Sequence, residues 1–377
     1  MFESAIGAAF LTFMITTLIV PWLQPLARRI GLVDRPGGRH AHERATPAVG
    51  GLSILLAAAP VGLLVLPLTT QVRGLGLAAV VIMVAGVADD LYRLRWFHRL
   101  AAQILAALVI IYVGDIRVDN VGEIFGFPLR PLGPLAIPLT VVATVGVINA
   151  VNMADGVDGL AGSVALITSL MLACAALYAG NIRLATGLAL VAGALCGFLI
   201  FNLRMPWNPR ARIFLGNAGS ELLGLFIASA CFRLTQNGHH PVGVQIAPFL
   251  VAPVLIDCLT LMLRRMRMGV SPFMGDRNHL HHMLLDAGVS PNGVVGLIAS
   301  STLLIGVLAA IALKAHVPAP YFSGVFVLLW AAYFMATRRR ERTVARLKRI
   351  FGPIEWMQDR EAFATTGVDA PEPEPSA

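Results

Sequence analysis

Long runs of apolar residues alternate with short polar segments over most of the 377 residues. Each run is long enough, or nearly so, for a helix to cross the roughly 30 Å hydrocarbon core of a bilayer. Two of them, 75–88 and 100–113, fall short of the ~20 residues that a spanning helix needs, so we expect their helices to continue into the neighbouring polar residues. The eleven runs lie at 4–23, 50–68, 75–88, 100–113, 135–151, 164–180, 184–203, 220–235, 245–263, 293–313 and 321–337. The pattern predicts an all-α integral membrane protein with about eleven transmembrane helices.

Basic residues are divided unevenly between the segments that join these helices. The segments on one side carry 23 Lys and Arg residues, whereas their counterparts on the other side carry 5. Because Lys and Arg resist translocation, the richer side is expected to be cytoplasmic, which makes the N-terminus periplasmic and the C-terminus cytoplasmic. We expect residues 1–337 to form one polytopic membrane domain. Residues 338–377 are expected to form a basic, then acidic and proline-rich, cytoplasmic tail that is partly disordered.

The composition agrees with a protein whose surroundings are the lipid bilayer. Hydrophobic residues make up 57% of the chain and charged residues 13%, and the mean hydropathy is +0.75. The formal net charge of +8 follows from the uneven distribution of basic residues, so it gives no reason to expect nucleic acid as a partner. The four cysteines lie inside apolar runs without CxxC spacing, which indicates packing residues rather than disulfides or zinc ligands.

Four polar clusters stand out because all of them fall on the predicted cytoplasmic side. They are Asp89 and Asp90 after the third run, Asn149, Asn152, Asp155 and Asp158 in NAVNMADGVDGLAG after the fifth, FLGNAGS (214–220) before the eighth, and DRNHLHH (276–282) after the ninth. Carboxylate and amide oxygens suit a hard cation such as Mg²⁺. A glycine-rich segment that opens a helix presents backbone N–H groups to phosphate oxygens, and imidazoles can donate to a diphosphate. Together the clusters predict a phosphoryl-transfer site.

Each cluster also has a plainer interpretation. Paired aspartates often end a solvated helix, glycines and aspartates are common in turns, and Ser220 is suited to cap the helix that follows it. Zinc is the rival ligand for the histidines, although no cysteine lies on that side. Asp257 lies inside the ninth run, on the same helical face as Arg264 and Arg265. For Asp257, as for Glu221, we favour a structural hydrogen bond or ion pair over a functional role.

The ordered motifs resemble those of the polyprenyl-phosphate N-acetylhexosamine-1-phosphate transferases, glycosyltransferase family 4. The resemblance runs from about residue 20 to 290 and is strongest to the bacterial undecaprenyl-phosphate N-acetylglucosamine-1-phosphate transferases. It is carried by DRPGGRHAHERATPAVGG, VADDLYRL, NAVNMADGVDGLAG, FLGNAGS and SPFMGDRNHLHH. The resemblance implies a multi-pass protein of the bacterial inner membrane with its active-site cleft on the cytoplasmic face. It implies transfer of a sugar 1-phosphate from a UDP-N-acetylhexosamine, UDP-N-acetylglucosamine in this branch, to undecaprenyl phosphate. The reaction would use Mg²⁺ or Mn²⁺, release UMP and start the synthesis of a lipid-linked glycan such as O-antigen, common antigen or exopolysaccharide.

The same resemblance implies roles for particular residues. The candidate catalytic residues are Asp89, Asp90, Asp155 and Asp158. The candidate metal ligands are Asp89, Asp90, Asn152 and Asn217. The candidate substrate-binding residues are Arg39, His42, Asn149, Asn152, Gly216, Arg265, His279, His281 and His282. Which of Asp89 and Asp90 activates the lipid phosphate is left open.

One position departs from the family pattern, FxGDxGS, in which the aspartate is a principal metal ligand. Asn217 stands there in this chain, and an amide oxygen supplies no negative charge to a cation. Three hypotheses remain: an engineered change, a natural variant with altered metal use, or a homologue that binds UDP-sugar and lipid phosphate without catalysis. A lipid-sugar transporter is a further alternative, but transporters place polar residues near the bilayer midplane. The N-acetylhexosamine, the glycan pathway and the existence of a homodimer stay open.

Overall fold

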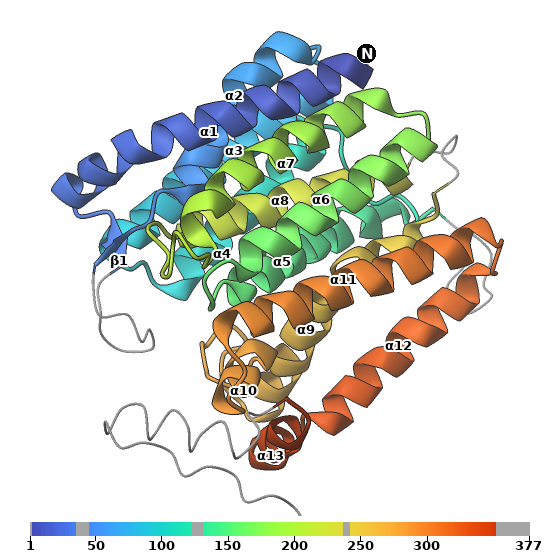
Figure 1. The fold of residues 1–377 in the computed structure, drawn as a ribbon. Helices are drawn as coiled ribbons and strands as arrows, with labels where there is room; N and C mark the ends of the chain where they lie inside the picture. The colour runs from blue at the N-terminus through green and yellow to red at the C-terminus, as the bar shows by residue number, and fades with distance from the viewer. Residues whose placement is uncertain (1, 35–44, 123–130, 237–241, 352–377) are drawn as a thin grey trace, which may run out of the picture.

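The computed structural model describes residues 2–34, 45–122, 131–236 and 242–351. The described chain is almost entirely helical, and Figure 1 shows the long helices lying side by side. The longer helices are α1 (Phe2–Ile30), α2 (Gly50–Val65), α3 (Thr70–Tyr92), α4 (Trp96–Tyr112), α5 (Ala136–Ala154), α6 (Leu160–Tyr178), α7 (Ile182–Asn202), α8 (Gly216–Thr235), α9 (Ala252–Arg267), α11 (Pro291–Lys314) and α12 (Ala319–Ala336). The shorter elements are β1 (Val33–Asp34), β2 (Thr46–Pro47), η1 (Gly133–Leu135), η2 (Val244–Val251), α10 (Leu280–Asp286) and α13 (Arg340–Phe351).

Each of the eleven expected apolar runs coincides with one of the longer helices. Among the described residues, nine helical segments are long and apolar enough to cross a membrane, while α2 and α4 have 16 and 17 residues. The all-α membrane class is therefore confirmed, whereas the number of helices that span and their orientation stay predictions. The two short runs do continue into polar residues, as expected. Helix α3 extends through Asp89 and Asp90 to Tyr92, and α4 already begins at Trp96.

Small residues bring α2 and α3 against the beginning of α8. A Cβ atom added to Gly51 would lie 2.3 Å from the Cα atom of Gly219, and one added to Gly86 would lie 2.3 Å from the Cα atom of Ala218. Such close approach of backbones is typical of glycine at helix interfaces in membranes. It places the first turn of α8 directly beside the last turns of α3, which carry Asp89 and Asp90.

The two strands and helices α10 and α13 gather at one end of the helix bundle, where Figure 1 shows β1, α10 and α13. Strands β1 and β2 pair in antiparallel register, Val33 with Pro47. The backbone N–H of Phe214 donates to the Pro47 carbonyl at 2.8 Å, which ties β2 to the segment before α8. Helix α13 occupies part of the expected tail, and Arg340 forms an ion pair with Asp286 of α10. These strands and α13 lie in segments that were expected to be irregular, and the apolar pattern did not predict them.

Candidate active site

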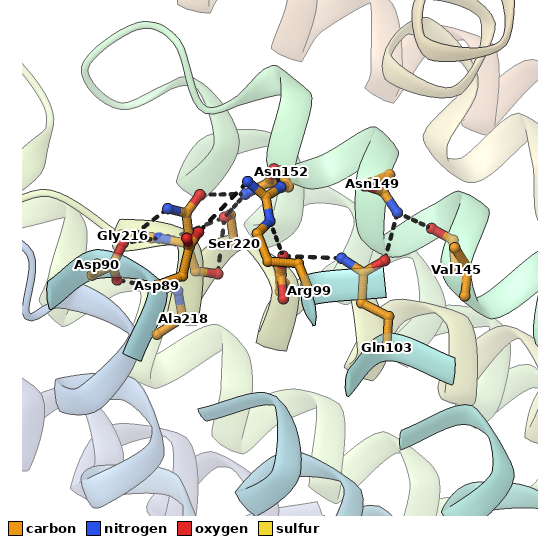
Figure 2. Close-up of polar contacts among 12 residues, drawn as sticks. Asp89, Asp90, Arg99, Gln103, Val145, Asn149, Asn152, Gly216, Ala218 and Ser220 are labelled. Carbon is orange, nitrogen blue, oxygen red and sulfur yellow. Dashed lines mark hydrogen bonds and ion pairs between the residues drawn. The ribbon is translucent and has the colours of Figure 1, made fainter. Parts of the chain in front are cut away.

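Asp90 accepts three hydrogen bonds from the first turn of α8. The backbone N–H groups of Asn217 and Ala218 donate to its two carboxylate oxygens at 2.9 and 3.3 Å, and Asn217 Nδ2 donates to Oδ1 at 3.0 Å (Figure 2). Gly216 has φ +75°, and a Cβ atom there would lie 2.6 Å from Asp90 Oδ2. Glycine is therefore needed at 216 both for its backbone conformation and for the close approach of the carboxylate. The positive end of the α8 dipole therefore faces the Asp90 carboxylate.

Helix α8 begins earlier than the sequence analysis expected. Ser220 lies inside the helix, where its hydroxyl donates to the Gly216 carbonyl at 3.1 Å, so the interpretation of Ser220 as an N-cap is wrong. The physical reason is that Asp90 of α3 accepts from the N–H groups of Asn217 and Ala218, which is the capping role expected of Ser220. The N–H groups expected to face phosphate are at the predicted place, but two of them are engaged by Asp90.

Asn152, at the end of α5, connects this turn to the rest of the site. Its Nδ2 atom donates to Asn217 Oδ1 at 3.1 Å and to Ser220 Oγ at 2.8 Å. Its Oδ1 atom accepts from Arg99 Nη2 at 3.1 Å. Residues of α3, α4, α5 and α8 are thus joined by one network of direct hydrogen bonds and ion pairs (Figure 2).

Arg99 is the cation of this network and was not singled out from the sequence. It lies one turn inside α4, 3.5 Å from Asp89 Oδ2 and 3.4 Å from Glu221 Oε1. Asp89 and Glu221 are 5% and 1% exposed, so one guanidinium balances two buried carboxylates. A signal existed in the sequence, since Arg99 follows the acidic pair by nine and ten residues in DDLYRLRWFHR, across a short connection between two helices. For Glu221, the structural interpretation agrees with these contacts.

A buried relay extends the network away from the site. Gln103 Nε2 donates to Glu221 Oε1 at 2.9 Å, and its Oε1 accepts from Asn149 Nδ2 at 2.7 Å. Asn149 also donates to the Val145 carbonyl of its own helix at 2.8 Å. Asn149 is 3% exposed. The amide of Asn149 is therefore directed into the helix interface, and it reaches the site only through Gln103 and Glu221.

The two aspartates after α5 have different surroundings. Asp158 is buried, accepts from Arg204 Nε at 2.8 Å, and anchors the segment that follows α7. Asp155 is half-buried, and within the described ranges its side chain has no hydrogen bond or ion pair. Burial, together with the negative charges of Asp90, Asp158 and Asp34, raises the pKa of Asp155 to about 7. Of the two, Asp155 is the carboxylate left available to a ligand.

The first histidine of the HLHH motif is held inside the protein. His279 Nδ1 lies 2.7 Å from Asp257 Oδ2, while the Tyr333 hydroxyl and the Leu280 N–H donate to Asp257 Oδ1 at 2.5 and 3.1 Å. On its other side, His279 Nε2 lies 3.4 Å from Arg265 Nη2. Asp257 is therefore a structural hydrogen-bonding group, as favoured, but its partners are His279 and Tyr333.

Arg265 is 1% exposed and is occupied by protein groups. It donates to Asp276 Oδ2 at 3.0 Å and to the Pro272 carbonyl at 2.8 Å. These bonds fold the segment between α9 and α10 back onto α9. The structure thus places Arg265 behind the histidines, where it supports their segment.

The second histidine packs against the turn that carries Asp155. A Cβ atom added to Gly156 would lie 2.3 Å from His281 Nε2, so this close contact requires glycine. Burial, with the neighbouring His282 and His279 charges, lowers the pKa of His281 to about 3, and the ring is therefore neutral near pH 7. His282, half-buried, follows it with ring centroids 4.3 Å apart. Arg39 and His42 lie outside the described residues.

The donor set at the first turn of α8 suits a hard divalent cation. The carboxylate oxygens of Asp90 and Oδ1 of Asn217 lie there beside the amide of Asn152, whose own Oδ1 accepts from Arg99. Mixed carboxylate and amide oxygens are the ligands that Mg²⁺ and Mn²⁺ accept. Within the described ranges, no group of three His, Cys, Asp or Glu side chains is arranged to hold a metal ion. The ligand set would therefore depend on amides, and it would carry less negative charge than an all-carboxylate one.

Comparison with known proteins adds an independent observation. Residues 72–235 match the model of the family described as glycosyl transferase family 4. The chain is 34% identical to the undecaprenyl-phosphate alpha-N-acetylglucosaminyl 1-phosphate transferase of Haemophilus influenzae, over 90% of this chain and 97% of that protein. It is 30% identical to the protein of the same name from Pasteurella multocida, over 90% and 95%. The identity to the Escherichia coli K12 protein of that name is 29%, over 90% and 92%.

Proposed function

The chain belongs to glycosyl transferase family 4, and on that premise we propose that it transfers N-acetylglucosamine 1-phosphate from UDP-N-acetylglucosamine to undecaprenyl phosphate. One observation carries the proposal: a relative named as this transferase matches the chain over 97% of its own length at 34% identity. The convergence of Asp90, Asn152 and Asn217 at a helix N-terminus supports it, because the site combines anionic, amide and N–H groups. The product would start a lipid-linked glycan at the cytoplasmic face of a bacterial inner membrane.

The chemistry is a phosphoryl transfer between two anions. An oxygen of the lipid phosphate attacks the sugar-bearing phosphorus of the UDP-sugar, the bond from that phosphorus to the bridging oxygen breaks, and UMP leaves. A monoalkyl phosphate has a second pKa near ~6 and is already mostly dianionic at pH 7, so little base strength is required. The main task of the site is to position the two anions and to neutralise their charge.

Asp90, Asn217 and Asn152 would hold a Mg²⁺ or Mn²⁺ ion beside the reacting phosphates. When bound, such an ion neutralises phosphate charge and orients the leaving group. Asp90 is the residue we assign closest to the reacting phosphates, because it lies among the α8 N–H groups. Asp89 is paired with Arg99 and would act by positioning that guanidinium.

The remaining candidate residues divide by their contacts. Asp155 would contact the ion or the nucleotide, since its carboxylate is not committed to a protein partner in the described ranges. His281 and His282 would border the diphosphate beside the Gly156 turn. Asp158, Arg265 and His279 would position these groups through the ion pair and hydrogen bonds already described. Arg39 and His42 would border the same site.

The test is release of UMP by the purified full chain from UDP-N-acetylglucosamine, with undecaprenyl phosphate and Mg²⁺. We expect release by the chain as it stands, a rate roughly a hundredfold lower for Asp90→Asn, and a rate on the order of tenfold higher for Asn217→Asp, because a carboxylate adds charge to the ion's ligands. Arg346→Gln, on the exposed face of α13, is the control and should not change the rate.

Binding measurements separate the outcomes. If neither the chain nor its Asn217→Asp variant releases UMP, although both bind UDP-N-acetylglucosamine in a Mg²⁺-dependent manner, the catalytic proposal is overturned in favour of a binding protein. If other UDP-N-acetylhexosamines are turned over and UDP-N-acetylglucosamine is not, the proposed sugar is wrong and the reaction type stands.

A further inference from the structure

A large cavity lies at the end of the bundle opposite the candidate active site. Its volume is about 1190 Å³, and its walls come mainly from α2, α3, α7 and α8. Apolar side chains form most of these walls, among them Leu63, Leu75, Leu188, Val191 and Phe226. The space between the helices therefore suits hydrocarbon chains.

Four arginines from four different segments line this cavity. Arg73 is in the first turn of α3, Arg117 follows α4, Arg183 is in the first turn of α7, and Arg233 is in the last turn of α8. The acidic lining residues are Asp115 and Asp119, which leaves an excess of positive charge. Arg117 is already paired with Asp119 at 2.7 Å.

The other three guanidinium groups have no such partner. Across the described part of the chain, the side chains of Arg73, Arg183 and Arg233 make no hydrogen bond or ion pair. An arginine at membrane depth is costly unless its charge is balanced. Arg233 is half-buried inside an apolar helix, so an anion bound beside it would remove part of that cost.

The arginines are also concentrated where basic residues are scarce. The predicted outer side, with Arg233, has only six Lys and Arg residues in the sequence, and four of them line this one cavity. The other two are Lys314, which is at the exposed end of α11, and Arg130, which lies outside the described residues. Positive charge is disfavoured on this side, and its accumulation at an apolar cavity indicates a specific anionic ligand.

We propose that this cavity binds an anionic phospholipid of the outer leaflet, with its phosphate among Arg73, Arg183 and Arg233 and its acyl chains along the apolar walls. Guanidinium groups suit phosphate oxygens because they donate in a planar, bidentate arrangement. The site is separate from the chemistry: Arg73 and Asp89 are 16 residues apart on α3, which is roughly 24 Å along the helix. The proposal therefore does not depend on the proposed function.

Lipid binding to the delipidated full chain in detergent would test this proposal. Native mass spectrometry would count bound phosphatidylglycerol and phosphatidylcholine of identical acyl chains over a concentration series. We expect half-saturation at a phosphatidylglycerol concentration on the order of tenfold lower than for phosphatidylcholine. The double variant Arg183→Gln/Arg233→Gln should lose most of that preference. Lys314→Gln removes an outer cation that does not line the cavity, and it should keep the preference.

A second pair of variants tests the apolar walls without changing any charge. Gly76 lines the cavity on α3, and a Cβ atom there has nothing within 4 Å, so Gly76→Phe would occupy the acyl-chain space. Gly324, on α12, is equally unobstructed and does not line the cavity, which makes Gly324→Phe the control. Weaker phosphatidylglycerol binding by the first variant alone supports the proposal. The proposal is overturned if the Arg183→Gln/Arg233→Gln and Gly76→Phe variants bind phosphatidylglycerol as tightly as the wild-type chain does and have unchanged unfolding temperatures.

Discussion

Asp155 combines a half-buried position with three neighbouring negative charges and no partner in the described ranges. Its raised pKa, about 7, means that the folded protein resists ionising this group. The unfolded chain ionises it near the ordinary value of ~3.9, so its contribution to stability is lost as the pH rises from there through about 7. An ionised carboxylate that destabilises the folded protein and has no protein partner is typical of a ligand-binding position.

Replacing Asp155 with Asn should therefore stabilise the metal-free protein at pH 8 and change it little at pH 4, since only the ionised form is unfavourable. Thermal unfolding of the purified chain in EDTA, compared with the variant at both pH values, measures this difference. Nucleotide binding should weaken in the same variant. A stabilisation of equal size at both pH values would contradict the assigned cause.

The matched control is Asp158→Asn, three residues away. Asp158 has a partner, Arg204, and loss of that ion pair should lower the free energy of unfolding by roughly 1 to 3 kcal/mol. We expect this destabilisation at pH 8, the condition in which Asp155→Asn is expected to stabilise the protein. The two aspartates of one loop would thus change stability in opposite directions.

At Asn217, the prediction concerns the affinity for Mg²⁺, which can be measured without an assay of the reaction rate. Its Nδ2 atom donates to Asp90 Oδ1 at 3.0 Å, so Asn217→Asp would replace that hydrogen bond with two adjacent carboxylates. In EDTA the variant should unfold at a lower temperature than the parent chain, because like charges repel. With Mg²⁺ it should gain more stability than the parent, with half of the gain at roughly tenfold less Mg²⁺. Equal Mg²⁺ dependence of unfolding in both proteins would count against a role for position 217 in metal binding.

At the scale of elements, one hydroxyl of α12 is linked through Asp257 to the start of α10. The Tyr333 hydroxyl donates to Asp257, which binds His279 and the Leu280 N–H at the start of α10. Tyr333→Phe should lower kcat several-fold with little change in KM for the nucleotide, because the histidines remain present but less well oriented. The loss of unfolding free energy should be about 1 kcal/mol. Steady-state kinetics with both substrates would separate kcat from KM.

Trp330→Phe provides the control for that experiment. Trp330 Nε1 donates to Thr260 Oγ1 at 3.1 Å, so the same two helices lose one hydrogen bond, about one turn away from Asp257. Among the hydrogen bonds of the described residues, neither Trp330 nor Thr260 bonds to residues 279–282. If both variants reduce kcat alike, the effect belongs to α9–α12 packing in general and the positioning role of Tyr333 is wrong.

Helices with long apolar runs could be predicted from the sequence, and so could the polar extensions of α3 and α4. The two-residue strands β1 and β2 could not, because they are too short to carry an alternating pattern, and β2 also bonds to Phe214, which is remote in the sequence. Helix α13 has a basic composition that suits a solvated tail equally well, and it packs against α10 with the Arg340–Asp286 ion pair between them. Local patterns predict elements that satisfy their own hydrogen bonds, and these three elements rely on distant partners.

At the scale of the whole molecule, the number of helices between the polar clusters was enough to predict that the clusters lie at the same end of the bundle. Each passage reverses the chain direction, so polar residues at the end of α3 and α5 and at the beginning of α8 had to meet at one end. The roles within that end were harder to predict. Gln103 and Tyr333 came from apolar runs that looked like ordinary packing surfaces, and Arg99 came from a basic segment in which nothing distinguished it from Arg93 and Arg95. Arg265 is of a residue type that suits a substrate ligand, but its guanidinium is paired with Asp276. Such assignments depend on which side chains face each other across helices.

The direction of the bundle in the membrane is the last prediction, and it concerns every site at once. Lys314, at the exposed end of α11, is predicted to face outward, and Arg346, on α13, inward. Lys314→Cys should react with a membrane-impermeant maleimide in intact spheroplasts, whereas Arg346→Cys should react only after permeabilisation. The native cysteines lie in α6, α7, α8 and α9, so a variant with all four replaced by Ala gives the background. Labelling of Arg346→Cys in intact spheroplasts would place the candidate active site outside the cell, where no UDP-sugar is supplied, and would overturn both the orientation and the proposed function.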